Sequence, residues 1–193
     1  MIYSKFTIVT FYQFKKIQDI LTIKNELSYF CKFNKIKGTI ILAEEGINGT
    51  IAGMSVNIKN FESHILKIGF HNYNPKYSYS KLMPFFRLKV RLKKEIVTLR
   101  TKIADPENIT GKKIKPDEWN NLISEKETIL IDVRNNFEIE MGTFKGSINP
   151  NTKSFTEFKK YLINNLDEAK NKKIAMFCTG GIRCEKISSY MIK

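Results

Sequence analysis

The residues best suited to chemistry in this sequence are a cysteine, two glycines and an arginine that lie close together. They occur in the run Cys178-Thr179-Gly180-Gly181-Ile182-Arg183. Adjacent glycines let the backbone curl so that several N–H groups face inward, which makes a cradle for an anion. These N–H groups, the positive end of a following helix and the Arg183 guanidinium all favour thiolate over thiol. The pattern predicts that Cys178 is a sulfur nucleophile.

A cysteine by itself is more often a buried packing residue at a strand end. Packing gives no reason, however, for two glycines between a strand and a helix, so we interpret Cys178 as functional. Four residues separate Cys178 from Arg183. Cysteine phosphatases have five residues in this place and hold a tetrahedral phosphate. The smaller ring suits a sulfur atom carried on sulfur better than a phosphate.

The elements around this loop have the pattern of a parallel α/β domain. Apolar runs at 128–134 (TILIDVR) and 172–178 (KKIAMFC) are typical of strands buried on both faces of a sheet. Helices are expected from Pro116, which suits a first turn, and over 154–166. Alternating strands and helices favour a parallel sheet, and ligands bind beyond the carboxyl ends of its strands. Cys178 lies at such an end.

The first half of the chain has the strand and helix order of a ferredoxin-like split βαβ domain. Period-two and helical spacings predict a strand at 4–14, a helix at 17–31, a hairpin within 38–53 that turns at Asn48-Gly49, a helix at 55–69 and a strand at 85–99. A polar stretch with Pro106 and Gly111 follows. We therefore expect domains at 1–100 and 116–193, joined by a linker at 101–115.

Bulk properties limit the location and the chemistry. No apolar run approaches the ~18 residues of a membrane span, and the N-terminus lacks the features of a signal peptide. We expect a cytoplasmic protein that does not contact the membrane. Three cysteines do not form a disulfide framework. Cys31, His64 and His71 have no paired ligand spacing, so we expect no metal.

The net charge of +14 has two interpretations. Clustered basic residues favour a polyanionic partner such as nucleic acid. Only five of the 33 basic residues are arginine, and the chain is rich in isoleucine and asparagine, a bias that AT-rich coding produces without any ligand. Charge alone does not decide between the two.

The Cys178 loop resembles the active-site loop of the rhodanese family, whose cysteine cycles through a persulfide. Asp132 and Arg134, followed by Phe137-Glu138, resemble the aspartate–arginine motif of that family, and 142–150 resembles its glycine-rich segment. Phe144 stands where many rhodaneses have a histidine. Cys184 is not part of the minimal loop: it either resolves an oxidised or persulfidated Cys178 or packs inside the helix.

A wider resemblance covers nearly the whole chain. Four segments are similar to the bacterial oxygen-dependent tRNA uridine hydroxylases: 38–53, 84–99, 131–155 and 176–186. That family joins a ferredoxin-like domain to a rhodanese-like domain and converts the wobble uridine at position 34 of tRNA to 5-hydroxyuridine with molecular oxygen. The resemblance implies that Cys178 is its essential cysteine, with tRNA as partner and oxygen as co-substrate. The sequence contains no flavin, haem or non-haem iron motif, so we expect no other cofactor.

The resemblance also gives a meaning to a strand with alternating charge. Period two places the basic side chains on one face and Leu88, Val90 and Leu92 on the other. The basic residues are Arg87, Lys89, Arg91 and Lys93. They are either a solvated strand face or a contact for the tRNA backbone.

Rhodanese-like domains continue beyond the helix in which Lys193 lies, and the hydroxylases continue into a cysteine-containing tail. The resemblance therefore implies that the rhodanese-like domain is incomplete and C-terminally truncated. Three functions stay open: an oxygen-dependent tRNA hydroxylase, a sulfurtransferase that acts through a Cys178 persulfide, and a non-enzymatic tRNA-binding or regulatory fragment. The sequence makes no prediction about oligomeric state.

Overall fold

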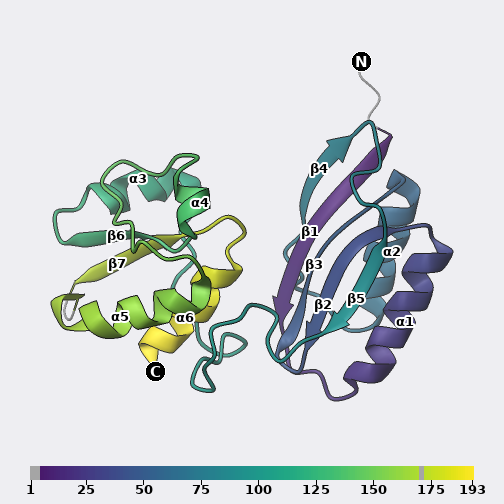
Figure 1. Ribbon diagram of the computed structural model, residues 1–193, viewed down its shortest axis with the longest axis horizontal. Helices are drawn as coiled ribbons and strands as arrows, with labels where there is room; N and C mark the ends of the chain where they lie inside the picture. The colour runs from purple at the N-terminus through teal and green to yellow at the C-terminus, as the bar shows by residue number, and fades with distance from the viewer. Residues whose placement is uncertain (1–4, 170–171) are drawn as a thin grey trace. The chain divides into compact units, whose positions relative to one another are not determined.

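The chain forms two compact units, Met1–Ile96 and Val97–Lys193 (Figure 1). The computed structural model describes residues 5–169 and 172–193. Residues 1–4, with the start of the predicted first strand, lie outside the described residues. Each unit has its own hydrophobic core, so each is described by itself.

The first unit is a mixed sheet with two helices on one face. Its elements are β1 (Phe6–Phe14), α1 (Ile20–Phe33), β2 (Lys37–Ala43), β3 (Gly46–Gly53), α2 (Ser55–Lys67), β4 (Lys76–Ser80) and β5 (Leu88–Leu92). The strand order is β4-β1-β3-β2-β5, with only the β2–β5 pair parallel. The first four strands in this order form the predicted ferredoxin-like sheet.

The strand that completes this sheet is not the one that the sequence predicts. β4 fills that place beside β1, and the predicted strand at 85–99 is shortened to β5, an extra edge strand beside β2. The four residues Lys76 to Tyr79 are exposed, so their hydrophobicity gives no period-two signal. Beyond β5 the chain leaves the ladder, and the Ile96 N–H donates to the Glu45 carboxylate at 2.7 Å.

The predicted turn of the hairpin is also wrong. Ala43 pairs with Gly46, so the chain turns at Glu44 and Glu45, while Asn48-Gly49 lies inside β3. Asn48 donates from Nδ2 to the Ile96 carbonyl at 3.0 Å. A Cβ on Gly49 would come within 2.8 Å of the Phe11 ring, so this glycine allows close packing and is not needed for a turn.

The core of the first unit lies between the sheet and its two helices. Helical spacing turns Leu27 and Cys31 of α1 and Phe61 and Ile65 of α2 toward the sheet, where all four are fully buried. Phe11 of β1 meets the Phe61 ring at a centroid distance of 5.3 Å. Burial of each large apolar side chain in this core stabilises the folded state by about 1.5–3 kcal/mol. Figure 1 shows both helices on the same side of the sheet.

The second unit is a small parallel α/β arrangement. Its elements are α3 (Pro116–Ser124), β6 (Thr128–Asp132), α4 (Asn136–Ile139), α5 (Phe155–Ala169), β7 (Lys173–Phe177) and α6 (Ile182–Ile192). β6 and β7 pair in parallel, as their apolar runs predict, and Ile148 forms a parallel bridge to Ile131 on the other side of β6. Phe158 and Ile187 are fully buried in its core.

The stretch interpreted as a linker, 101–115, belongs to this second unit and contacts α6. Ser188 Oγ accepts from the Gly111 N–H at 2.9 Å, and Ser189 Oγ accepts from the Asp105 N–H at 2.7 Å. Both serines are buried. The polar composition that suggests a free connector therefore reflects hydrogen bonding to the helix that follows the Cys178 loop.

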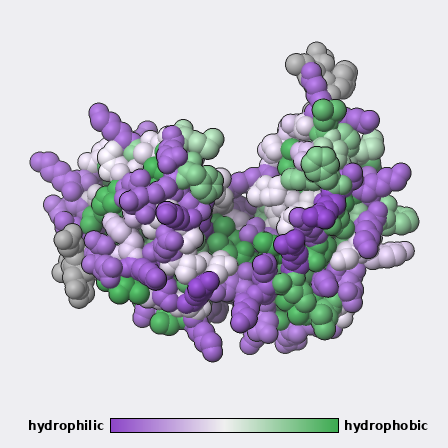
Figure 2. Space-filling view, in the orientation of Figure 1, coloured by the Kyte–Doolittle hydropathy of each residue, from purple (hydrophilic) through white to green (hydrophobic). Residues whose placement is uncertain are grey.

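On the face drawn in Figure 2, hydrophilic side chains predominate, with several groups of apolar side chains between them. Four large rings of the first unit are strongly exposed: Tyr29, Phe33, Tyr79 and Phe86. Phe86 is 100% exposed and lies just before β5. No helix in the described ranges is long and apolar enough to cross a membrane.

Gly46 should be difficult to replace with any other residue. Its φ is +145°, and an added Cβ would lie 2.1 Å from the Gln13 carbonyl oxygen, which is backbone and cannot move aside. Gly46→Ala should lower the free energy of unfolding by about 3 kcal/mol, measured by denaturant unfolding with circular dichroism. Gly69→Ala is the matched control, because its φ is +94° but its Cβ would meet only the Lys15 ammonium. The control should cost about 1 kcal/mol; equal losses would contradict the backbone clash.

Candidate active site

Cys178 lies where the sequence predicts, directly after β7 and before α6. Gly181 is the N-cap of α6 and has a φ of +95°, a left-handed conformation that favours glycine. In this conformation the Gly181 N–H points at Cys178 and donates to its Sγ at 3.0 Å. The curled backbone therefore forms a cradle for sulfur, as the glycines predict.

The surroundings of Cys178 stabilise its thiolate. A hydrogen bond from the Cys184 side chain is the largest of several effects that lower the pKa of Cys178 to about 5. The Cys184 N–H, the Arg183 charge and the Gly181 N–H act in the same direction, and burial opposes them. At neutral pH the group is therefore a thiolate, which is the nucleophilic form of cysteine.

Cys184 has a role that its sequence position does not reveal. Its side chain is held among the core residues of the second unit, and its thiol donates to the Cys178 sulfur. The same contact and its burial raise the pKa of Cys184, so it stays a thiol and a donor. That Cys184 resolves an oxidised Cys178 stays a prediction.

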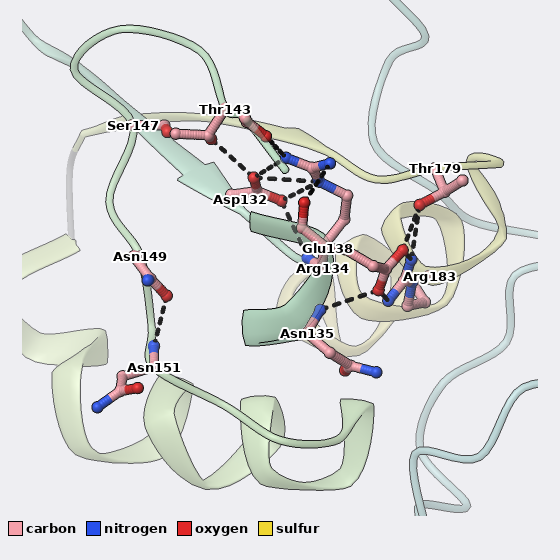
Figure 3. A network of polar contacts seen from close by, with 11 residues as sticks. Asp132, Arg134, Asn135, Glu138, Thr143, Ser147, Asn149, Asn151, Thr179 and Arg183 are labelled. Atoms are coloured by element: carbon pink, nitrogen blue, oxygen red, sulfur yellow. Dashed lines mark hydrogen bonds and ion pairs between the residues drawn. The ribbon is translucent and has the colours of Figure 1, made fainter. Parts of the chain in front are cut away.

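Arg183 forms a two-point ion pair with Glu138 (Figure 3). Its Nη1 and Nη2 each lie 2.7 Å from one carboxylate oxygen, and Nη2 also lies 3.1 Å from Thr179 Oγ1. Both side chains of the pair are largely buried. The hydrogen bonds from Arg183 are the main reason that the pKa of Glu138 is lowered to about 2. The pair fixes the guanidinium beside the Cys178 loop.

Asp132 and Arg134 form a second pair at the end of β6. Arg134 Nε and Nη2 bind the two Asp132 oxygens at 2.9 and 2.6 Å, and Thr143 Oγ1 donates to Asp132 at 2.8 Å. Arg134 also donates to the carbonyls of Glu138 and Gly142. Burial acts to raise the pKa of Asp132, but these hydrogen bonds outweigh it and lower the pKa. The pair holds the backbone that carries Glu138.

The predicted residues fall into two groups. The Cys178 loop, Asp132, Arg134 and Cys184 come together in the second unit. The basic residues predicted to contact tRNA lie in the first unit, where Lys89 and Arg91 are in β5, and Arg87 and Lys93 flank it. In the part of the chain that the structure describes, no three metal-ligating side chains form a group.

Glu138 was named as part of a motif, but sequence reasoning gave it no role in the site. Its distance from Arg183 along the chain hides the ion pair, and its short helix α4 has no clear periodicity. The spacing Asn135-x-x-Glu138 was an available signal, because a glutamate at this position often caps a helix start. Its carboxylate does accept from the Asn135 N–H, at 3.0 Å. Capping and the ion pair together fix its two oxygens.

Phe144, which replaces the histidine of many rhodaneses, has a packing role. Its ring meets Phe177 at a centroid distance of 4.8 Å and Trp119 at 5.6 Å. The Arg134 guanidinium lies over the Phe177 ring, with its central carbon 5.6 Å from the ring centroid. The position that holds a histidine in many rhodaneses is therefore occupied here by a phenylalanine that belongs to an aromatic cluster.

Each of the two units contains a match to a known domain. Residues 6–96 match the UPF0176 acylphosphatase-like domain, and residues 115–193 match the rhodanese-like domain. The chain therefore joins these two kinds of domain, and the rhodanese-like domain is the one that its motifs predict. It is 46% identical over 189 residues to the tRNA uridine(34) hydroxylase of Acaryochloris marina.

That match covers 97% of this chain, and the chain spans 61% of the length of the relative. Among solved structures, an acylphosphatase from Coxiella burnetii is similar to 47% of this chain over its own full length. Its sequence identity is 13% and its TM-score is 0.34.

Removing the Cys184 thiol should raise the pKa of Cys178. The rate of alkylation by iodoacetamide, measured against pH, should have its midpoint near pH 5 in the unchanged chain, since the pKa of Cys178 is about 5. In Cys184→Ala the midpoint should move upward, and in Cys184→Ser it should move less, because a hydroxyl still donates. Cys31 is buried, with a pKa of about 12, and should not react. An unmoved midpoint in Cys184→Ala would show that the thiol does not stabilise the thiolate.

The Arg183–Glu138 pair should make the second unit sensitive to acid. The folded pKa of Glu138, about 2, is below its ordinary 4.5, so its contribution is present above about pH 4.5 and is lost as pH falls toward 2. Glu138→Gln should remove this part of the pH dependence. Trp119, the only tryptophan, reports on the second unit in denaturant unfolding. The exposed Glu140→Gln is the control and should keep the dependence of the unchanged chain.

Proposed function

We propose that this chain hydroxylates the wobble uridine, at position 34 of tRNA, to 5-hydroxyuridine with molecular oxygen. The observation that carries the proposal is the Cys178 thiolate, held by Gly181 and Cys184 at the end of β7. The relative that is 46% identical is named a tRNA uridine(34) hydroxylase, and its match includes nearly all of this chain. Such an enzyme would act on tRNA in the cytoplasm.

The thiolate has a chemical use in this reaction. The C6 atom of a uracil ring is electron-poor, because it is conjugated with the C4 carbonyl, and a thiolate can add to it. The addition would make C5 electron-rich and able to bond one atom of molecular oxygen. The other oxygen atom would leave as water, with two electrons from a two-electron reductant and two protons. Loss of the C5 proton would then expel the thiolate from C6. The Gly181 N–H and the Cys184 thiol would hold the sulfur in place before addition and after its release.

The basic strand β5 supports tRNA as the substrate. Leu88 and Val90 pack against the core of the first unit, so Lys89 and Arg91 lie on the other face, as alternation predicts. Arg91 is exposed, and the whole chain carries a net charge of +14. Phosphate contacts from such residues supply affinity that does not depend on base sequence.

A second candidate is a sulfurtransferase, favoured by the one-sulfur size of the Cys178 cradle. The thiolate would attack the outer sulfur of thiosulfate, forming an S–S bond while sulfite leaves with the electron pair. Cyanide would then take the outer sulfur as thiocyanate, returning the thiolate. A low pKa at Cys178 serves this reaction equally well.

Cys178→Ser should abolish the modification. In the test, a strain that lacks the gene is complemented with the unchanged chain or with the variant. Its tRNA nucleosides are then measured by mass spectrometry. The unchanged chain should restore 5-hydroxyuridine derivatives, and Cys178→Ser should not, because an alcohol is not ionised at neutral pH. Cys31→Ala removes a cysteine from the other unit and should retain the modification.

The outcomes separate the three functions. Intact modification without the gene, together with Cys178-dependent thiosulfate:cyanide activity, would favour the sulfurtransferase and contradict the hydroxylase. A Cys178→Ser chain that behaves like the unchanged chain in both assays would contradict both enzymes. That result would leave a binding or regulatory fragment.

A further inference from the structure

We propose that the helix-free face of the first unit's sheet binds single-stranded nucleotides of tRNA, as in an anticodon loop, and that Phe86 stacks on one of their bases. The choice of tRNA rests on the proposed function. The surface itself is inferred from strand register, charge and exposure.

The register of the sheet aligns five polar side chains across all five strands. Thr10 of β1 pairs with Lys76 of β4 on one side and with Thr50 of β3 on the other. Thr50 pairs with Thr39 of β2, which pairs with Lys89 of β5. We call these residues the hydroxyl row: Lys76, Thr10, Thr50, Thr39 and Lys89. The Thr10 and Thr50 hydroxyls lie 3.0 Å apart.

The hydroxyl row lies on the face opposite the core. Val9, Phe11 and Ile40, the sequence neighbours of its members, are fully buried against the helices. Strand alternation therefore turns the row to the other face, which has no helix of the described first unit on it. The three threonines are half-buried and Lys76 is exposed. A flat polar strip is left in the middle of the sheet.

Part of this face is covered, which limits the surface to one end. Asn48 donates to the Ile96 carbonyl, and Ile96 is buried, so the chain beyond β5 lies over the sheet at this point. Tyr12, which pairs with Asn48, is buried as well. The hydroxyl row is the next row along the strands on the same face and stays partly exposed.

The charge on this face suits a polyanion. Among the strand positions that alternation places there, the ionised side chains are Lys37, Lys76, Lys89 and Arg91, and none is acidic. The cations stand toward the outer strands and the hydroxyls in the middle. Ammonium groups bind phosphates, and threonine hydroxyls bind phosphates or 2′-hydroxyls. An open sheet of this topology is also a known platform for single-stranded RNA.

Phe86 adds a contact for bases. Its ring is 100% exposed, and the residue lies at the edge of the sheet, outside the strand and two residues before β5 begins. A fully exposed ring beside cations is a stacking surface for an unpaired base. A paired stem offers no such base, so the occupant we infer is a loop and not a duplex.

The test measures binding of the 193-residue chain to fluorescent RNA by anisotropy. One probe is a hairpin that reproduces an anticodon stem and loop, and the other is a duplex of the same stem. Phe86→Ala should weaken hairpin binding roughly 5- to 100-fold and duplex binding far less. Lys76→Glu with Lys89→Glu should weaken both and lower the slope of log affinity against log salt by roughly two.

Matched variants on the helix side of the same unit control for ring loss and charge. Phe33→Ala removes an exposed ring of α1, and Lys59→Glu reverses an exposed charge of α2. Both should bind like the unchanged chain, and circular dichroism should show all variants folded. If the hydroxyl-row and Phe86 variants also bind like the unchanged chain, the proposal is wrong. If Phe86→Ala weakens hairpin and duplex equally, the single-strand assignment is wrong.

These outcomes are independent of the proposed reaction. If Phe86→Ala abolishes hairpin binding but the unchanged chain does not modify uridine, the binding surface is supported and the hydroxylase function is contradicted. If tRNA modification depends on Cys178 but hairpin binding does not change in the hydroxyl-row and Phe86 variants, the hydroxylase function is supported and the binding surface is contradicted.

Discussion

Stabilisation of a half-buried sulfur anion is the constraint on which the arrangement around Cys178 depends. Burial alone would raise the pKa of Cys178, yet the pKa lies near 5 because donors and a positive charge outweigh the loss of water. Each of these donors depends on backbone geometry. Gly181 must adopt a positive φ for its N–H to reach the sulfur, and Cys184 must lie in the first turns of α6.

Two arginine–carboxylate pairs hold this geometry, and they are linked through α4. Arg183 binds the Glu138 carboxylate, while Arg134 binds Asp132 and the Glu138 carbonyl. A two-point pair fixes direction as well as distance, since a planar guanidinium meets a planar carboxylate edge to edge. The ends of β6 and β7 are thus joined through side chains as well as through the strand ladder. Loss of either pair would leave a charge without its partner in a largely buried place.

The first unit has a different character, because its helix-free face carries the hydroxyl row and basic side chains, where the second unit has a compact sulfur cradle. Under the proposed function the first unit binds tRNA and the second unit carries the reactive thiolate. Weak, numerous phosphate and stacking contacts suit an open sheet, and a single reactive atom suits a closed loop. Glu138 and Asp132 each have an arginine partner. Neither residue therefore presents an unpaired carboxylate near Cys178.

The sequence by itself determined the features that depend on neighbouring residues: the cradle around Cys178, the apolar strands β6 and β7, and the ferredoxin-like order of the first unit. It misplaced the turn before Gly46 and missed β4, because an exposed edge strand has no hydrophobic pattern and the ladder with β1 alone makes it a strand. Glu138 gains its role only when α4 comes beside the Cys178 loop, 45 residues away from Arg183. The donor role of Cys184 likewise exists only after α6 brings its thiol back toward the sulfur, since a hydrogen bond depends on distance in space. The candidate nucleophile could therefore be predicted from the sequence, whereas the groups that lower its pKa and hold it in place were decided by the tertiary structure.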